Sequence, residues 1–506
     1  MKATLFLGLL SLGWVAFAQQ IGDGPIVKEH LDQAAIERGT ISFEDLLTAG
    51  EKLFVAKFNT YDGQGRPGTT GHGVSRDPEG VPRFVRTSSP EANSCAGCHN
   101  DPFVGGAGDF VANVFVLAQT LDPVTMSVAA DFSNERNTLG MHGSGAIEML
   151  AREMTDELIA IRDAAIQQAQ DEGQTISRAL FAKGISFGTI RAAADGSLDT
   201  SAVVGVDEAD LIIKPFHQKG VVTSVRQFSN NAFNHHHGMQ SVERFGVDRT
   251  GTDDFDGDGV KDELTVGDIT AVTLWQTSLG VPGQVIPNDG TVARAILVGE
   301  RTFGNIGCAD CHTPYMTLNN PTFTEPNPYN PDGNLQPDQV SRSIEYDMTS
   351  QGDKPYLESR YDGSAVVRAF TDLKRHNLCD ADYNHYCNEE LEQDGVATEL
   401  FLTRKLWDVG NTAPYGHRGD LTTITEAISA HGGEGRASRE AFFALSDQSR
   451  AEVVEFLKSL QILPPGTESL VVDGEGTAKS KAATARALGL PGTNDFDIKS
   501  PSRNWQ

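Results

Sequence analysis

Two short cysteine motifs carry the residue types and spacing in this chain that predict a defined chemistry. The pattern C-x-x-C-H occurs twice, as Cys95, Cys98 and His99 and as Cys308, Cys311 and His312. In this motif two thiols three positions apart reach the two vinyl groups of one porphyrin, and the following histidine lies under its iron. The sequence therefore predicts two covalently bound haem c groups, with His99 and His312 as the proximal iron ligands.

The sequence around each motif repeats, and this repeat predicts the elements that position the haem turns. GEKLF (50–54) and GERTF (299–303) precede the two motifs and close stretches with apolar residues at helical spacing. Segments 264–279 and 445–460 have equal length, and proline and glycine follow each of them, as at the end of a helix. A helix, a haem turn and a closing helix make up a class I cytochrome c domain. We therefore expect a mainly α fold of two class I cytochrome c-like domains with long loops and an insert in the first.

The start of the chain predicts export. Residues 1–18 contain a lysine, an apolar run and an Ala-Phe-Ala site, which is the pattern of a signal peptide cleaved near Ala18. The apolar run is too short to span a bilayer, and no later segment approaches that length. The expected segments are a signal peptide (1–18), an N-terminal extension (19–40), the two haem domains (41–285 and 286–466) and a tail (467–506).

Charge and the remaining cysteines narrow the setting further. The 506 residues carry a formal net charge of −28, which makes nucleic acid and anionic membranes poor partners. Cys379 and Cys387 are left over from the haem motifs, and in an oxidising compartment they are expected to form a disulfide, with two free thiols as the alternative. We predict a periplasmic location. The oligomeric state is left open.

One long segment resembles a known family. LWDVGNTAPYGHRGDLTTITEAISAHGGE (406–434) is similar to a block of the di-haem oxidoreductases related to bacterial di-haem cytochrome c peroxidases and to the quinone-cofactor maturase. In the peroxidases this block leads to the methionine that ligates the C-terminal haem. The resemblance implies that His431 is the sixth ligand opposite His312, with His376 as the second candidate and a surface role as the alternative. His417 is expected to be structural.

The same resemblance places a run of three histidines, His235, His236 and His237, over the N-terminal haem. The peroxidases have a glutamate here that moves a proton during peroxide cleavage, and imidazole can perform the same transfer. Alternatively, one histidine or Met239 ligates the iron, or the run is a hydrogen-bonded or exposed loop. His142 is a further candidate for this pocket.

Two calcium sites are expected. DDFDGDGVKDE places Asp254, Asp256, Asp258 and Asp262 at alternate positions of a turn, where carboxylate oxygens can surround Ca²⁺. Glu263 could replace the missing glutamate of position 12, and a solvated acidic loop is the alternative. The family resemblance implies a second site at the backbone carbonyls of Thr412 and Pro414.

These expectations lead to one function and two alternatives. We expect a di-haem enzyme that reduces peroxide, or another small oxidant, at the N-terminal haem with electrons relayed through the C-terminal haem. A small soluble cytochrome c or cupredoxin would supply the electrons. The alternatives are a di-haem electron-transfer cytochrome and a haem oxygenase that acts on an organic substrate.

Overall fold

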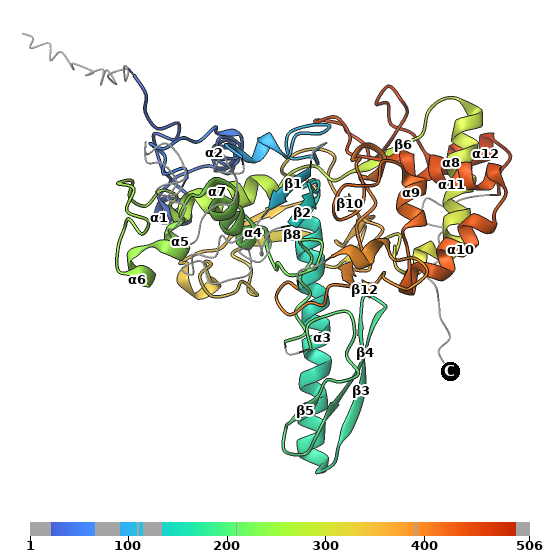
Figure 1. Ribbon diagram of the computed structural model, residues 1–506, viewed down its shortest axis with the longest axis horizontal. Coiled ribbons are helices and arrows are strands. Elements are labelled where there is room, and N and C mark those ends of the chain that lie inside the picture. The colour runs from blue at the N-terminus through green and yellow to red at the C-terminus, as the bar shows by residue number, and fades with distance from the viewer. Residues whose placement is uncertain are drawn as a thin grey trace, which may run out of the picture.

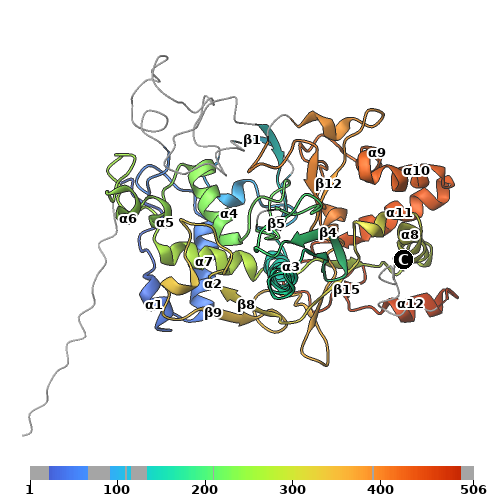
Figure 2. The same cartoon turned by 90° about the horizontal axis from the view of Figure 1, so that it is seen from below.

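The computed structural model describes residues 22–65, 92–108, 111–114, 134–208, 210–389 and 392–491. The predicted signal peptide lies outside these residues. Two groups of helices lie side by side, with short strands between them, and a long arm projects from the middle (Figure 1). The same arrangement is seen from below in Figure 2. No described helix is long and apolar enough to cross a membrane.

The helices are distributed over both groups and the arm. They are α1 (Gln33–Glu37), α2 (Phe43–Val55), α3 (Ser144–Glu172), α4 (Val225–Ala232), α5 (Val242–Phe245), α6 (Val247–Thr250), α7 (Val266–Thr277), α8 (Gly290–Asn305), α9 (Ile424–Ser429), α10 (Arg436–Ala444), α11 (Asp447–Ser459) and α12 (Lys481–Ala487).

A helix pair stands at the centre of each group, and a glycine allows each pair to pack closely. In the first pair α2 packs on α7, and in the second α8 packs on α11. A side chain at Gly50 would overlap the carbonyl oxygen of Ala271, and one at Gly299 would overlap that of Glu452. These are the glycines of the GEKLF and GERTF repeats. Each repeat therefore marks the point where its helix crosses the closing helix.

The prediction of a mainly α fold is wrong. The chain is 36% helical with 14% strand, and the described strands form six small sheets. The strands are β1 (Val111–Val114), β2 (Asn134–Asn137), β3 (Ile176–Ala182), β4 (Ile185–Ala192), β5 (Leu198–Asp199), β6 (Gly283–Val285), β7 (Met316–Leu318), β8 (Thr322–Glu325), β9 (Ile344–Asp347), β10 (Glu358–Ser359), β11 (Ala365–Val367), β12 (Arg375–Asn377), β13 (Leu400–Leu402), β14 (Leu460–Gln461) and β15 (Val471–Val472). Most of them are too short for an alternating pattern to show in the sequence.

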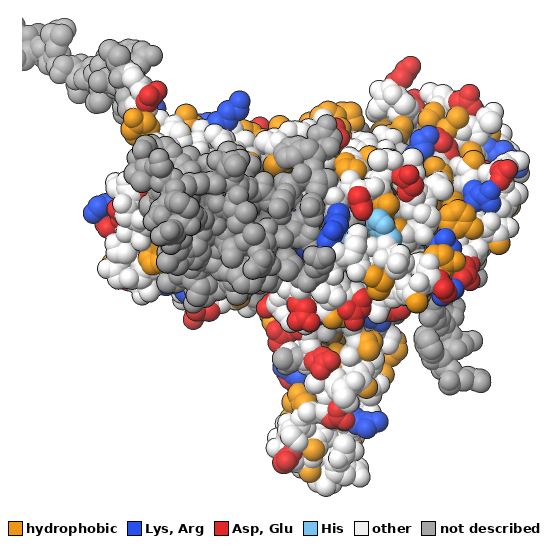
Figure 3. All heavy atoms as spheres, in the orientation of Figure 1, with side chains coloured by type: hydrophobic (Ala, Val, Ile, Leu, Met, Phe, Trp, Pro, Cys, Tyr) orange, Lys and Arg blue, Asp and Glu red, His pale blue; other side chains and the backbone are white. Residues whose placement is uncertain are grey.

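The arm consists of α3 and the β3–β4–β5 sheet (Figure 1). Helix α3 has 29 residues; its first half is buried in the body and its second half packs on the strands of the arm. Acidic and basic side chains are interspersed over the described part of the face seen in Figure 3 and form no single patch.

The two main hydrophobic clusters do not follow the order of the chain. The first contains residues of α2, α3 and α7 and also residues from 316–373, which follow the second haem motif. The second contains α8, α9 and α11. Part of the predicted tail packs on this second cluster, because Ala485 of α12 is fully buried in it. The long connection after His312 thus returns to the first helix group.

A buried arginine joins the elements of the first group. Arg226 on α4 is fully buried, and its guanidinium donates hydrogen bonds to Glu243, Glu325 and Thr270. These partners lie on α5, β8 and α7. The contact holds α4, and the histidine run that follows it, against three other elements.

Replacement of Arg226 by leucine is expected to lower the free energy of unfolding by about 3–5 kcal/mol, because two buried carboxylates lose their cation. Arg162 on α3, which pairs with Asp163 at a partly exposed position, provides the control. Its replacement by leucine is expected to cost less than about 1 kcal/mol. Urea denaturation of both variants tests this, and equal midpoints would contradict a central role for Arg226.

Candidate functional site

The first C-x-x-C-H motif forms a short turn that presents one imidazole nitrogen. Cys95–Gly97 is a 3₁₀ turn, η1, capped by the hydroxyl of Ser94, and the thiols of Cys95 and Cys98 are not bonded to each other. His99 Nδ1 donates to the carbonyl oxygen of Gly106 at 3.3 Å, which leaves Nε2 as the acceptor. Burial lowers the pKa of His99 to about 4. The ring is therefore neutral, as a metal ligand must be.

The second motif repeats this arrangement. Cys308–Asp310 forms the turn η5, and His312 Nδ1 donates to the carbonyl of Phe370 at 3.1 Å. Burial again lowers the pKa, to about 4 for His312. The last residue of each sequence repeat packs on the histidine: Phe54 lies 6.2 Å from His99 and Phe303 lies 6.3 Å from His312, ring centre to ring centre. The two sites are built alike on their proximal sides.

The rings of His431 and His312 lie close to each other. The ring centres are 6.5 Å apart, and His431 Nδ1 donates to the carbonyl of Ala427 at 2.8 Å. A metal–imidazole bond of about 2 Å places two rings that share one ion about 6 Å apart between centres. The separation fits one iron between the two Nε2 atoms. The residues present therefore fit a six-coordinate haem at this site.

His376 is not arranged as the sixth ligand of the haem iron, although it groups with Cys311 and Asp372. Its Nδ1 lies 2.8 Å from Glu434 and its Nε2 lies 2.9 Å from Asp372, so both ring nitrogens contact carboxylates. Burial alone would lower the pKa of His376, but hydrogen bonds with Asp372, Cys311 and Glu434 raise it to about 12. A charged imidazolium has no lone pair for iron, so the geometry favours His431.

The histidine run lies in a π-helical turn, η4 (Phe233–His237), which continues α4. Its three members have different surroundings. His237 Nδ1 donates to the carbonyl of Ala92 at 2.7 Å, and its Nε2 lies 3.4 Å from Cys95 Sγ. His237 therefore contacts the attachment cysteine itself.

Two members of the run, His236 and His237, interact electrostatically with the proximal histidine. Burial is the main cause of the low pKa of His99, and repulsion from His236 adds to it. His236 is half-buried, whereas His235 is buried. Met239 is 1% exposed and packs in the first hydrophobic cluster. These surroundings single out His236 as the candidate distal group. His142 donates from Nδ1 to Gly280 at 3.1 Å.

A disulfide joins Cys379 and Cys387 and closes a loop beside His431. Tyr386 from this loop lies 6.1 Å from the ring of His431. The amides of the two glycines after His431 donate to Leu378 and to Asp380, on either side of Cys379. The loop therefore stabilises the turn that carries His431.

The acidic loop brings three of its four predicted ligands together. Oxygens of Asp254, Asp256 and Asp258 lie within 4.8 Å of one another, and Asp262 is not in this group. Glu263 is 3% exposed, and burial together with repulsion from the three aspartates raises its pKa well above the usual range. Its side chain contacts Gly63, two residues before Gly65, whose amide donates to the carbonyl of His237. The segment 63–65 thus contacts both the acidic loop and the histidine run.

The carbonyl oxygen of Pro414 accepts a hydrogen bond from Asn137, a residue that the sequence analysis did not single out. Asn137 Nδ2 donates to it at 2.6 Å, and Asn137 Oδ1 is buried without a hydrogen-bond partner. Rotation of this amide by half a turn would place two oxygens together, as a cation requires. The Thr412 hydroxyl donates to Asp408 at 2.8 Å.

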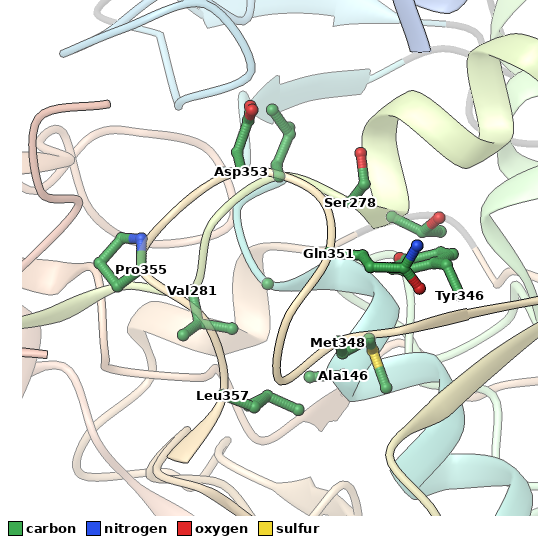
Figure 4. Close-up of a pocket in the computed structure, with 12 residues that line it drawn as sticks. Ala146, Ser278, Val281, Tyr346, Met348, Gln351, Asp353, Pro355 and Leu357 are labelled. Atoms are coloured by element: carbon green, nitrogen blue, oxygen red, sulfur yellow. The ribbon is translucent and has the colours of Figure 1, made fainter. Parts of the chain in front are cut away.

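A small cavity lies apart from these residues (Figure 4). Ser278, Tyr346, Gln351 and Asp353 contribute to its lining, and its volume is about 20 Å³. This is enough for one water molecule. None of the site residues expected from the sequence lines it, so the cavity does not mark the site.

Residues 353–460 match the family described as "Di-haem oxidoreductase, putative peroxidase". The matched segment contains His376, the disulfide and His431. It confirms the resemblance stated above and, with it, the prediction of an oxidoreductase with haem cofactors. No curated protein matches the chain.

A solved structure entitled "Crystal structure of a MauG-like protein associated with microbial copper homeostasis" is 13% identical in sequence. The match covers 93% of this chain and 98% of that one, with a TM-score of 0.32. This TM-score does not establish a common fold.

Replacement of His431 by alanine is expected to convert the C-terminal haem from low-spin to high-spin with both haems still attached, because one axial position is vacated. Replacement of His376 by glutamine is the control and should leave the haem low-spin. Electron paramagnetic resonance of the oxidised proteins measures this. A low-spin signal that persists in the first variant and disappears in the second would reverse the assignment.

Proposed function

We propose that this chain is a periplasmic di-haem c oxidoreductase that reduces peroxide at the N-terminal site and receives electrons through the C-terminal site. The observation that carries the proposal is the difference between the two sites. His312 has an imidazole opposite it at a separation suited to shared ligation. Among the described residues, no histidine ring pairs with His99 in this way; its ring contact is Phe54. We therefore propose that the C-terminal site is closed and that the N-terminal site admits a small molecule.

The residues of the N-terminal site have separate tasks. Haem bound at the two sites supplies the electron transfer and the reduction of peroxide. The carbonyl of Gly106 orients His99 and directs its Nε2 lone pair away from the backbone. In this proposal His236 moves a proton to or from the bound oxidant. His237 is held on Ala92 and Cys95 and positions the attachment turn.

The C-terminal site needs no proton-transfer group. His312 and His431 both donate Nδ1–H to backbone carbonyls, so both rings are fixed before any ion binds. Fixed ligands reduce the reorganisation that accompanies a change of iron charge. A small soluble cytochrome c or cupredoxin is the proposed electron donor to this site.

The experiment that tests the proposal is stopped-flow mixing of the half-reduced protein with hydrogen peroxide. A pyridine haemochrome spectrum first establishes two bis-thioether haems per chain. A high-spin N-terminal haem that reacts with peroxide supports the enzyme. Two fully low-spin haems that do not react would identify an electron-transfer cytochrome instead.

Replacement of His236 by glutamine is expected to slow peroxide cleavage about 10²–10⁴-fold, which is the usual contribution of a general acid–base group. The same change at His235 is the control and should leave the rate close to that of the wild type. Haem attachment is expected in both variants. If His236 ligates the iron instead, its removal would speed peroxide binding and change the spin state of the resting protein.

We also propose that the acidic loop binds Ca²⁺ through Asp254, Asp256 and Asp258. Three carboxylates within 4.8 Å, with buried Glu263 beside them, repel one another unless a cation lies between them. The carbonyls of Thr412 and Pro414 with Asn137 form the proposed second site. A calcium ion at either site is bound by the folded chain only.

Chelation of calcium is expected to lower the melting temperature, because a ligand of the folded state stabilises it by about 2.7 kcal/mol at 100 times its Kd. The triple change of Asp254, Asp256 and Asp258 to asparagine should abolish most of this difference. Replacement of the exposed Asp248 by asparagine is the control and should preserve it. Equal melting temperatures with calcium and with chelator would show the loop to be a solvated turn.

A further inference from the structure

A group of basic side chains is buried between the two candidate haem sites. Lys219 is 0% exposed, Arg136 6%, His417 4% and His217 8%. Arg136 lies on β2, and Lys219 and His217 lie in the loop before α4. Strands β2 and β12 stand between the two groups of helices in Figure 1, and β12 does so in Figure 2 as well. We call these four residues the basic cluster.

Among the described residues, the ammonium of Lys219 is hydrogen-bonded to carbonyl groups and to no carboxylate. Arg136 pairs with Glu389 at 2.6 Å. Lys219 Nζ donates to the carbonyls of Ala397 at 2.7 Å and Thr398 at 2.9 Å, neither of which carries a charge. Burial lowers the pKa of Lys219 to about 8, although Glu389 raises it. A buried cation without a counter-charge is costly.

The two imidazoles of the basic cluster also have unused hydrogen-bonding capacity. His217 Nδ1 and both ring nitrogens of His417 are buried without a hydrogen-bond partner, and the nearest carboxylate oxygen recorded for His417 is that of Glu389, at 4.0 Å. Buried polar atoms almost always have a partner. The basic cluster therefore has a surplus of positive charge and lacks a partner for its imidazoles, and a carboxylate would meet both needs.

The position of the basic cluster indicates which carboxylate this is. His217 packs on Phe228 of α4 with ring centres 6.4 Å apart, and α4 continues into the histidine run, so the cluster reaches the N-terminal site. Burial is the main cause that lowers the pKa of His217 to about 3, and repulsion from Arg136 and from His236 adds to it. Tyr386 lies 5.5 Å from the ring of His417 and 6.1 Å from that of His431, so the cluster also approaches the C-terminal site. Residues of both candidate haem sites therefore lie near the basic cluster.

We infer that Arg136, Lys219, His217 and His417 bind haem propionate carboxylates between the two sites. The inference rests on the proposed function, because it requires haem at those sites. A guanidinium and an ammonium form short, charge-assisted hydrogen bonds with carboxylates. The propionates supply the missing negative charge, and the imidazoles then gain the partner that they lack.

Replacement of Lys219 by methionine in the haem-loaded protein is the principal test. The propionate bending bands in the resonance Raman spectrum are expected to shift, and the reduction potential of at least one haem is expected to fall, because a cation near the oxidised and reduced iron is removed. Lys183 is the control: its side chain is 7% exposed in the arm and pairs with Glu153 and Glu157. Its replacement by methionine should leave the bands and both potentials unchanged.

A second variant keeps the test decisive if the first does not fold. Replacement of His417 by leucine removes two ring nitrogens without changing the charge, and it should also shift the propionate bands. Unchanged bands in a variant that retains both haems would overturn the inference while leaving the proposed function intact. A response of the wild-type haem spectra to added formate, with constant propionate bands, would assign the cluster to a free carboxylate and would also overturn it. Absence of covalent haem from the wild-type protein would refute the proposed function itself.

Discussion

The hydrogen bond from an imidazole Nδ1–H to a backbone carbonyl is the interaction on which both candidate sites depend. It orients His99 on Gly106, His312 on Phe370 and His431 on Ala427. Each bond selects the tautomer whose Nε2 is free to ligate iron, and it fixes the ring plane. The acceptors are backbone atoms, so the ligand geometry is set by the path of the chain. The elements that position Gly106, Phe370 and Ala427 therefore determine indirectly how the candidate iron ligands are oriented.

The arrangement of buried charge separates the structural role from the chemical one. Arg226 is surrounded by two carboxylates, which fully compensate it and hold α4 in place. His376 is likewise held between two carboxylates and becomes part of the framework of the second site. Lys219 and the imidazoles near it are not compensated in this way. Arg226 and His376 are thus paired with carboxylates where they hold elements of the fold together. Lys219, which has no carboxylate in hydrogen-bond contact among the described residues, lies where haem groups are expected.

The proximal side of each candidate site could be predicted from local sequence features. The other side depends on contacts between residues that are far apart in the chain. The glycine and phenylalanine of GEKLF and GERTF act within their own helix and turn, so Gly50, Phe54 and their counterparts could be recognised. The choice between His431 and His376 depends on Glu434, which lies 58 residues from His376 in the chain. The short strands escaped prediction because their partners are supplied by the tertiary fold. The three histidines could not be ranked, because their surroundings come from Ala92, Cys95 and His99, far away in sequence.

The π-helical turn at Phe233–His237 bears on how the histidine run would respond to a change in the length of the chain. Such a turn accommodates one more residue than an α-helical turn, and one residue corresponds to a rotation of about 100° around the helix axis. Loss or gain of a single residue upstream in α4 would rotate a neighbouring histidine towards the position that His236 now occupies. Three adjacent imidazoles therefore let the chain absorb small changes of length while an imidazole stays near His99. A one-residue insertion or deletion in α4 would therefore replace His236 with a neighbouring histidine and not with a different residue type.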